Sequence, residues 1–205
     1  MIDPWLLLAF LPAALALNLT PGADMMFCFG QGLRAGPHPA MAASAGIALG
    51  SLVHAAAAAL GVSALVAAAP WLFDVIRWLG VGYLLWLALG ALRTGPLQAK
   101  GRPMSPARAF REGLVVNLTN PKVILFVLAF LPQFADPSRA LLPQFLVMGV
   151  MLGIGGLVIN GAVGVFAGGL GRRLARSPRL ARGMGIATAT IFAALAARLA
   201  ILERA

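Results

Sequence analysis

The stretch Asn18-Leu19-Thr20-Pro21-Gly22-Ala23-Asp24 returns later in the chain as Asn117-Leu118-Thr119-Asn120-Pro121-Lys122. The copies begin 99 residues apart (117 minus 18) in a chain of 205 residues, so they divide it into two similar halves. Each copy puts Asn, Thr, Pro and a charge inside a hydrophobic stretch, where polar and charged groups are costly and usually functional. A repeated interruption of this kind predicts a transport site.

Composition predicts an integral membrane protein. Hydrophobic residues make up 60% of the chain, charged residues only 11%, and the mean hydropathy is +0.90, whereas soluble domains carry about 25% charged residues. We therefore expect a single transmembrane transporter domain over residues 1–205. Cys28 is the only cysteine, which excludes an internal disulfide, and two histidines are too few to predict a metal cluster. No cofactor is predicted.

Hydrophobic segments predict six membrane-spanning helices. They cover roughly residues 5–33, 40–69, 72–92, 110–134, 141–170 and 183–202. Repeat one would occupy about residues 1–93, a cytoplasmic linker about 94–109, and repeat two about 110–205. Because each half has an odd number of spans, the second must enter the membrane in the opposite sense. The expected fold is all-α, with two inverted-topology three-helix repeats whose first and fourth helices break at the motifs.

Positive charges predict the orientation. Four lie on the predicted outer side: Arg77, Arg139, Arg198 and Arg204. Eleven lie at the connections after the first, third and fifth spans: Arg34, Arg93, Lys100, Arg102, Arg108, Arg111, Arg172, Arg173, Arg176, Arg179 and Arg182. The positive-inside rule puts the eleven in the cytoplasm and both termini outside, in a bacterial inner membrane. No aromatic residue interleaves the arginines at 172–182, so no nucleic-acid partner is expected.

The prolines predict the chemistry of each break. Pro21 cannot donate to the carbonyl of Leu17, and Pro121 cannot donate to that of Asn117. Unsatisfied backbone groups cost several kcal/mol in lipid, so both carbonyls need partners. A new half-helix after each proline would offer free N–H groups to a carboxylate. The nearby side chains that can satisfy some of the backbone are Asn18, Thr20, Asn117, Thr119 and Asn120.

Two opposite charges are predicted to share one depth. Asp24 lies ten residues before Arg34, or ~15 Å along a helix, and Lys122 lies eleven residues after Arg111, or ~16 Å. Half of a ~30 Å hydrocarbon core is about 15 Å, so both charges fall near the midplane. A local role for each stays open: Asp24 as a cap on its own half-helix, and Lys122 as a side chain that snorkels toward water.

The second span carries a further candidate. Gly46, Gly50 and His54 recur every four residues and share one helix face. The glycines predict close helix packing, and His54 either donates to a backbone carbonyl or shuttles a proton. In the fifth span, Asn160 either contacts the solute or bonds a neighbouring helix. Tyr83 is expected at the membrane interface or in the core.

These motifs resemble those of LysE/RhtB-type exporters of amino acids and their derivatives. The resemblance is carried by NLTPGADM at 18–25, by Gly46, Gly50 and His54, by LGVGYLLWLALGAL at 79–92 and by FREGLVVNLTNPKVILFVLAFLPQF at 110–134. It implies six spans and export of small amphipathic solutes, coupled to the proton motive force. The family usually has a second proline where this chain has Ala23, so the first break is expected to be less rigid here.

The sequence hypothesis is a secondary transporter for an amino acid-like solute and a proton, within the lipid bilayer. A homo-oligomer is compatible with the sequence. The alternatives are a channel or a non-transporting membrane subunit, and a membrane-embedded enzyme, which only six acidic residues argue against. Asp24 or His54 would exchange the proton. The predicted substrate-binding residues are Asn18, Thr20, Pro21, Gly22, Asp24, Asn117, Thr119, Asn120, Pro121 and Lys122.

Overall fold

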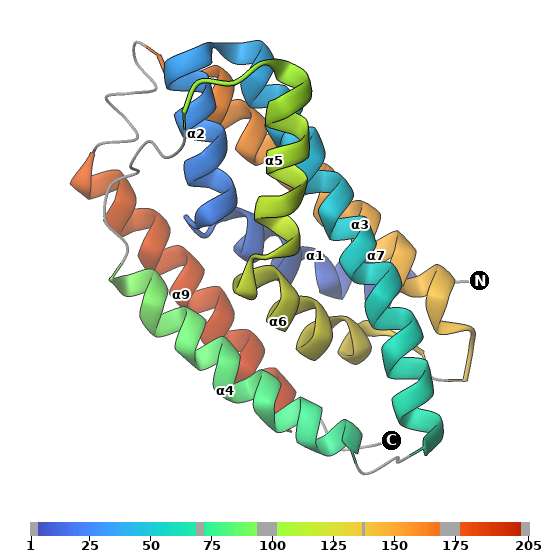
Figure 1. The fold of residues 1–205 in the computed structure, drawn as a ribbon. Coiled ribbons are helices and arrows are strands. Elements are labelled where there is room, and N and C mark those ends of the chain that lie inside the picture. The colour runs from blue at the N-terminus through green and yellow to red at the C-terminus, as the bar shows by residue number, and fades with distance from the viewer. Residues whose placement is uncertain (1–3, 69–71, 94–101, 137, 169–176, 202–205) are drawn as a thin grey trace.

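A computed structural model describes residues 4–68, 72–93, 102–136, 138–168 and 177–201, and within them all regular structure is helical (Figure 1). The first half contains helices α1 (Pro4–Leu19), α2 (Ala23–Ala35), α3 (Pro37–Ala68) and α4 (Leu72–Leu92). The second half contains α5 (Pro106–Leu118), α6 (Pro121–Phe130), a 3-10 turn η1 (Leu131–Phe134), α7 (Leu141–Val165) and α9 (Pro178–Ile201).

Three helices are long and apolar enough to cross a bilayer: α3, α7 and α9. The pairs α1–α2 and α5–α6 raise this number to five if each pair is one span. The prediction of an all-helical membrane protein is confirmed. The predicted third span falls on α4, where the apolar stretch found among the described residues is Trp78–Leu92. Over the described residues, length and composition therefore support three to five spans, and the sixth span stays a prediction.

Both motifs interrupt a helix. The axes of α1 and α2 differ by 52° across residues 20–22, and those of α5 and α6 by 54° across residues 119–120. Pro21 lies inside the first gap, and Pro121 opens α6 at the position where a missing N–H costs least. Asn120 caps α6, since its side-chain oxygen accepts from the Lys122 amide at 3.0 Å. The prolines thus divide each stretch into two half-helices where the sequence places them.

Helix α3 makes its most extensive contacts with α5 and α7. A Cβ built at Gly46 would overlap the carbonyl oxygen of Phe110, and one at Gly113 would overlap that of Ala43. At the contact between α3 and α7, a Cβ at Gly153 would lie 3.1 Å from the carbonyl oxygen of Ala48. Glycine therefore sets how closely the two halves approach, as the packing interpretation of the Gly46 face predicts.

Helices α4 and α9 form a pair along one side of the bundle (Figure 1). This pair contacts the rest of the molecule mainly through α6 and α1. An aromatic cluster binds α1 to the second half, with Phe10 of α1 5.5 Å from Phe134 of η1 between ring centroids. Large apolar side chains such as Trp86 and Leu79 stay exposed on α4, which suits a surface in contact with lipid.

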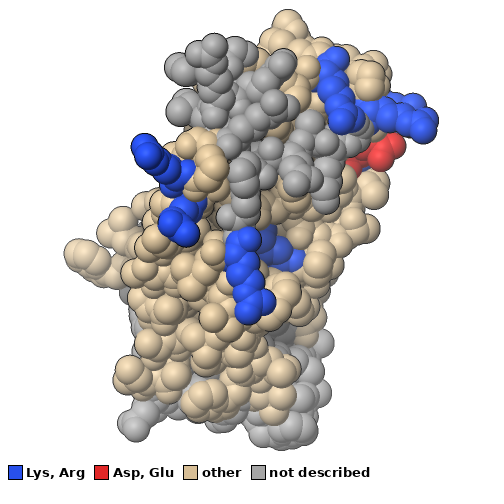
Figure 2. All heavy atoms as spheres, turned by 90° about the vertical axis from the view of Figure 1, so that its left-hand side faces the viewer, with Lys and Arg blue, Asp and Glu red and all other residues tan. Residues whose placement is uncertain are grey.

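Basic side chains gather toward one end of the molecule. On the face shown in Figure 2 they lie in the upper and middle parts, and the described surface at the bottom carries none. The side-chain amide of Gln31, at the end of α2, donates to the carbonyl oxygen of Arg102 at 2.8 Å. The first connection and the segment before α5 therefore share one end. Several basic residues of the orientation argument lie outside the described residues, as do residues 94–101 of the linker predicted at about 94–109: Lys100, Arg172, Arg173, Arg176 and Arg204.

Candidate functional site

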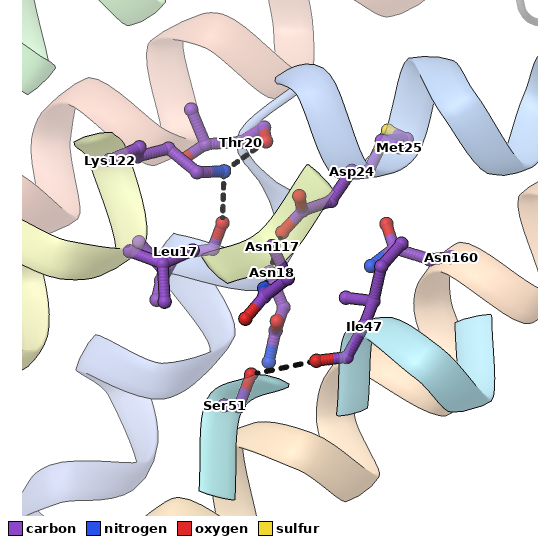
Figure 3. Close-up of a pocket in the computed structure, with 11 residues that line it drawn as sticks. Leu17, Asn18, Thr20, Asp24, Met25, Ile47, Ser51, Asn117, Lys122 and Asn160 are labelled. Atoms are coloured by element: carbon purple, nitrogen blue, oxygen red, sulfur yellow. Dashed lines mark hydrogen bonds between the residues drawn. The ribbon is translucent and has the colours of Figure 1, made fainter. Parts of the chain in front are cut away.

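Asp24 sits in the first turn of α2 and points to the other break (Figure 3). Its side chain is buried, and its two carboxylate oxygens each accept an amide donor at 2.9 Å, one from Asn117 and one from Asn120. Both donors belong to the second motif. The carboxylate also lies near the N-terminus of α2, where the helix dipole favours a negative charge. Asp24 is thus a tether between the two breaks rather than a cap on its own helix.

Lys122 makes the reverse connection. Its ammonium nitrogen donates to the carbonyl oxygens of Leu17 and Thr20, at 2.9 Å each. The Leu17 carbonyl is the one that Pro21 leaves without its helical donor. A Cβ at Gly22 would lie 3.2 Å from the ammonium nitrogen, so glycine at this position leaves room for it. The ammonium group therefore stays inside the protein rather than snorkelling toward the membrane surface.

The Asn117 carbonyl, which Pro121 leaves without its helical donor, also contacts a side chain from another helix. His54 of α3 places Nε2 3.1 Å from the carbonyl oxygen of Asn117. This contact agrees with the prediction that His54 bonds a backbone carbonyl. Tyr83 of α4 donates to the carbonyl oxygen of Lys122 at 3.2 Å, so Tyr83 supports the second break, a role that its aromatic character alone did not indicate.

The two charges are not joined directly. Both Asp24 and Lys122 lie in the described part of the chain, and no ion pair within 4 Å links the ammonium nitrogen of Lys122 to the Asp24 carboxylate. Each charge is instead stabilised by neutral dipoles from the opposite motif. Charge-assisted hydrogen bonds are among the stronger ones in a dry interior. The Asp24 carboxylate and the Lys122 ammonium therefore lie at one site without a direct ion pair between them.

A narrow pocket lies where the breaks meet α3 and α7 (Figure 3). It has space for about one water molecule, so in this conformation it is too small for an amino acid. Its walls come from both halves of the chain. The lining residues are Leu17, Asn18, Thr20, Asp24, Met25, Ile47, Ser51, Asn117, Lys122, Val123 and Asn160.

Several predicted site residues turn away from the pocket or serve their own helix. Thr119 is exposed and donates to the carbonyl oxygen of Val115, one turn before it. Thr20 lines the pocket, but its hydroxyl donates to the carbonyl oxygen of Ala16. Asn18 reaches α7, where it donates to the carbonyl oxygen of Leu152 at 3.2 Å. Pro21 and Pro121 shape the breaks and do not line the pocket.

Ser51 is the polar lining residue that the sequence analysis missed. Its position matches a regular pattern, because Ile47, Ser51 and His54 follow the i, i+4, i+7 spacing of one helix face. A serine in an apolar helix commonly bonds its own backbone, and Ser51 does contact the Ile47 carbonyl, at 3.4 Å. The spacing from His54 was the signal that could have identified it.

Among the described residues, no group of three or more His, Cys, Asp or Glu side chains lies close enough together to bind a metal ion.

Comparison with known proteins identifies the family. A family model described as LysE type translocator matches residues 15–203, nearly the whole chain. The chain belongs to the LysE family. The resemblance found in the sequence is therefore confirmed, and because LysE family members are translocators, the membrane-enzyme alternative is excluded.

Curated relatives of this LysE chain include proteins named for efflux. It is 37% identical over 183 residues to an uncharacterized membrane protein of Vibrio cholerae, covering 87% of each chain. It is 29% identical to the homoserine/homoserine lactone efflux protein of Salmonella typhimurium, covering 96% of this chain and 97% of the relative. It is 36% identical to the leucine efflux protein of Klebsiella pneumoniae, covering 63% of each. No solved structure matches the chain.

Proposed function

We propose that this LysE family member exports a small amino acid, or a close derivative, from the cytoplasm across the bacterial inner membrane, driven by proton entry. The efflux names of its relatives support the substrate class. The observation that carries the proposal is the crossed pair of contacts at the breaks: Lys122 on the carbonyls of the first motif, and Asp24 on the amides of the second. One acid and one base at one site suit a zwitterion.

The substrate would exchange with these internal partners. Its carboxylate would pair with Lys122, and its ammonium group would approach Asp24 and the carbonyl of Leu17. In the closed pocket that carbonyl already holds the Lys122 ammonium, and the carbonyl of Asn117 already holds His54. The substrate ammonium would therefore replace an internal ammonium rather than fill an empty position, and the displaced Lys122 would become available to the substrate carboxylate.

Transport would follow from rocking of two inverted repeats about this site. Some packing pairs support such a symmetry, because they have a counterpart when the halves are exchanged. Helix α3 packs on α7 and α4 on α9, which pairs equivalent helices. The contact of α3 with α5 corresponds to that of α7 with α1, and the contact of α2 with α7 to that of α6 with α3. The same proposal includes three further points: both termini lie outside, Asp24 or His54 couples transport to the proton, and the protein assembles into a homo-oligomer.

The test is efflux from vesicles loaded with a panel of labelled amino acids, with and without an imposed pH gradient. We expect outward flux that a proton gradient accelerates in the wild-type protein, and none in Asp24→Asn or Lys122→Ala, although both insert into the membrane at wild-type levels. Wild-type flux in either variant would refute the assignment of the site. A channel predicts passive flux that ignores the pH gradient.

A further inference from the structure

Two polar side chains that line the pocket lack a complete set of hydrogen-bond partners among the described residues. Asn160 of α7 is only 3% exposed and lines the pocket, and no group in the described part of the chain hydrogen-bonds its side-chain amide. Asn117 is 1% exposed, and its side-chain oxygen Oδ1 has no donor among the described residues. Buried polar groups are almost always hydrogen-bonded, so each exception needs an explanation.

The positions of these groups separate them from the charged pair. Figure 3 shows Asn160 pointing into the pocket from α7, on the side away from Lys122, with Asp24 and Asn117 between them. The Asn117 amide nitrogen is already engaged by Asp24, which leaves only the oxygen to accept a donor. Asn160 brings both a donor and an acceptor. Together, Asn160 and the Asn117 oxygen can make hydrogen bonds that neither Asp24 nor Lys122 uses.

We propose that Asn160 and the Oδ1 atom of Asn117 form a subsite for the side chain of the exported amino acid, and that this subsite selects an uncharged hydrogen-bonding group, a hydroxyl or an amide. The inference rests on the proposed export function and narrows its substrate. Asp24 and Lys122 are committed to the substrate's ammonium and carboxylate. No other charged residue lines the pocket, so a basic or acidic side chain would be buried without a counter-charge.

An aliphatic side chain fits this subsite poorly for a different reason. On closure of the pocket it would leave the Asn160 amide and the Asn117 oxygen without water or ligand, and a site built around hydrogen bonds strongly rejects an analogue that lacks the matching group. The remaining walls, Met25, Ile47 and Val123, are apolar. They suit the methylene groups between the backbone and a terminal polar atom.

The experiment uses the full-length protein in proteoliposomes and pairs of substrates that differ by one hydroxyl. Homoserine and norvaline are near-isosteres, as are threonine and valine, and lysine completes the panel. We expect the wild-type protein to export the hydroxylated member of each pair at least about tenfold faster than its partner. Asn160→Leu should reduce that ratio about tenfold by losing the hydroxylated substrate while the aliphatic one is still exported.

Two variants control for a merely structural effect. Asn160→Ser keeps a hydrogen-bonding group and should retain most of the preference. Val158→Leu changes an exposed position on the same helix and should change neither rate. If Asn160→Leu does not insert, Asn160→Ala serves in its place, and the wild-type ratio tests the subsite independently of any variant.

The outcomes separate the subsite from the function. A wild-type protein that exports no member of the panel would overturn the proposed export function itself. Export with equal rates within each pair, export of lysine alone, or a ratio that Asn160→Leu leaves unchanged would overturn the subsite and leave amino acid export standing.

Discussion

Lys122, in the second copy of the motif, donates to the carbonyl oxygen of Leu17, which Pro21 leaves free in the first copy, at 2.9 Å. The two residues are 105 positions apart in the chain. The Lys122 ammonium of the second break therefore satisfies a free carbonyl of the first break. In the opposite direction, the Asp24 carboxylate beside the first break accepts hydrogen bonds from the second. Any change that moves this ammonium group disturbs both halves at once.

Gly22 controls the position of that ammonium group. In Gly22→Ala the new Cβ would lie 3.2 Å from the Lys122 nitrogen, closer than ordinary contact allows, and we expect export to fall by about threefold to tenfold as the hydrogen bonds lengthen. The backbone itself is not strained, because the φ of −156° at Gly22 suits any residue. Gly61→Ala, at a position with open space, is the matched control in the same flux assay.

The charges of Asp24 and Lys122 should prove coupled in stability. Replacing either residue removes its hydrogen bonds to the opposite break, and a hydrogen bond to a charged group contributes about 1.5–3 kcal/mol. We expect Lys122→Met and Asp24→Asn each to lower the free energy of unfolding in detergent, and the double variant to lose at least ~1 kcal/mol less than the sum. Strict additivity would show that the charges do not interact. Neither single variant nor the double should export.

His54→Gln separates the hydrogen bond of His54 from its proposed role in proton transfer. Glutamine can still donate to the Asn117 carbonyl, which His54 contacts at 3.1 Å, but it does not change charge between about pH 5 and 8 as histidine does. We expect flux down a substrate gradient to persist and its acceleration by an imposed pH gradient to disappear. Acceleration that survives in His54→Gln would assign the proton to Asp24 instead.

The glycine contacts between α3 and α5 should limit stability. A Cβ at Gly113 would overlap the backbone carbonyl of Ala43, so we expect Gly113→Ala to cost about 1–3 kcal/mol through forced separation of the helices. Gly82→Ala places its methyl group in open space and should be neutral, or stabilising by up to about 1 kcal/mol. Thermal unfolding of the purified proteins measures both. Equal melting temperatures for the two variants would contradict the packing argument.

The orientation can be tested by labelling single cysteines. The native Cys28 is fully buried and should not react with an impermeant maleimide. Ser138→Cys, in the loop before α7, should react in intact cells, whereas Ser105→Cys, next to the basic start of α5, should react only in inside-out vesicles. The reverse pattern would put both termini in the cytoplasm.

Proline chemistry made the location of the breaks predictable, but not the partners of the released groups. The carbonyls of Leu17 and Asn117 needed donors for a local reason. That the donors are Lys122 and His54 depends on which helices lie against each break. Thr119 shows the same limit, because it belongs to the motif and yet faces outward. The turn of the helix axis at the break decides which motif side chains enter the pocket.

The sequence by itself determined the membrane class and the position of both breaks, because these follow from composition and from the missing proline N–H. The tertiary structure alone decided that the two motifs satisfy each other crosswise, and that Ser51 and Asn160 join them in one pocket. Such contacts join residues far apart in the chain, so they depend on which helices pack together and on the rotation of each helix about its axis. The spacing of Gly46 and Gly50 predicted a close helix contact, but no local pattern encodes which helix it meets.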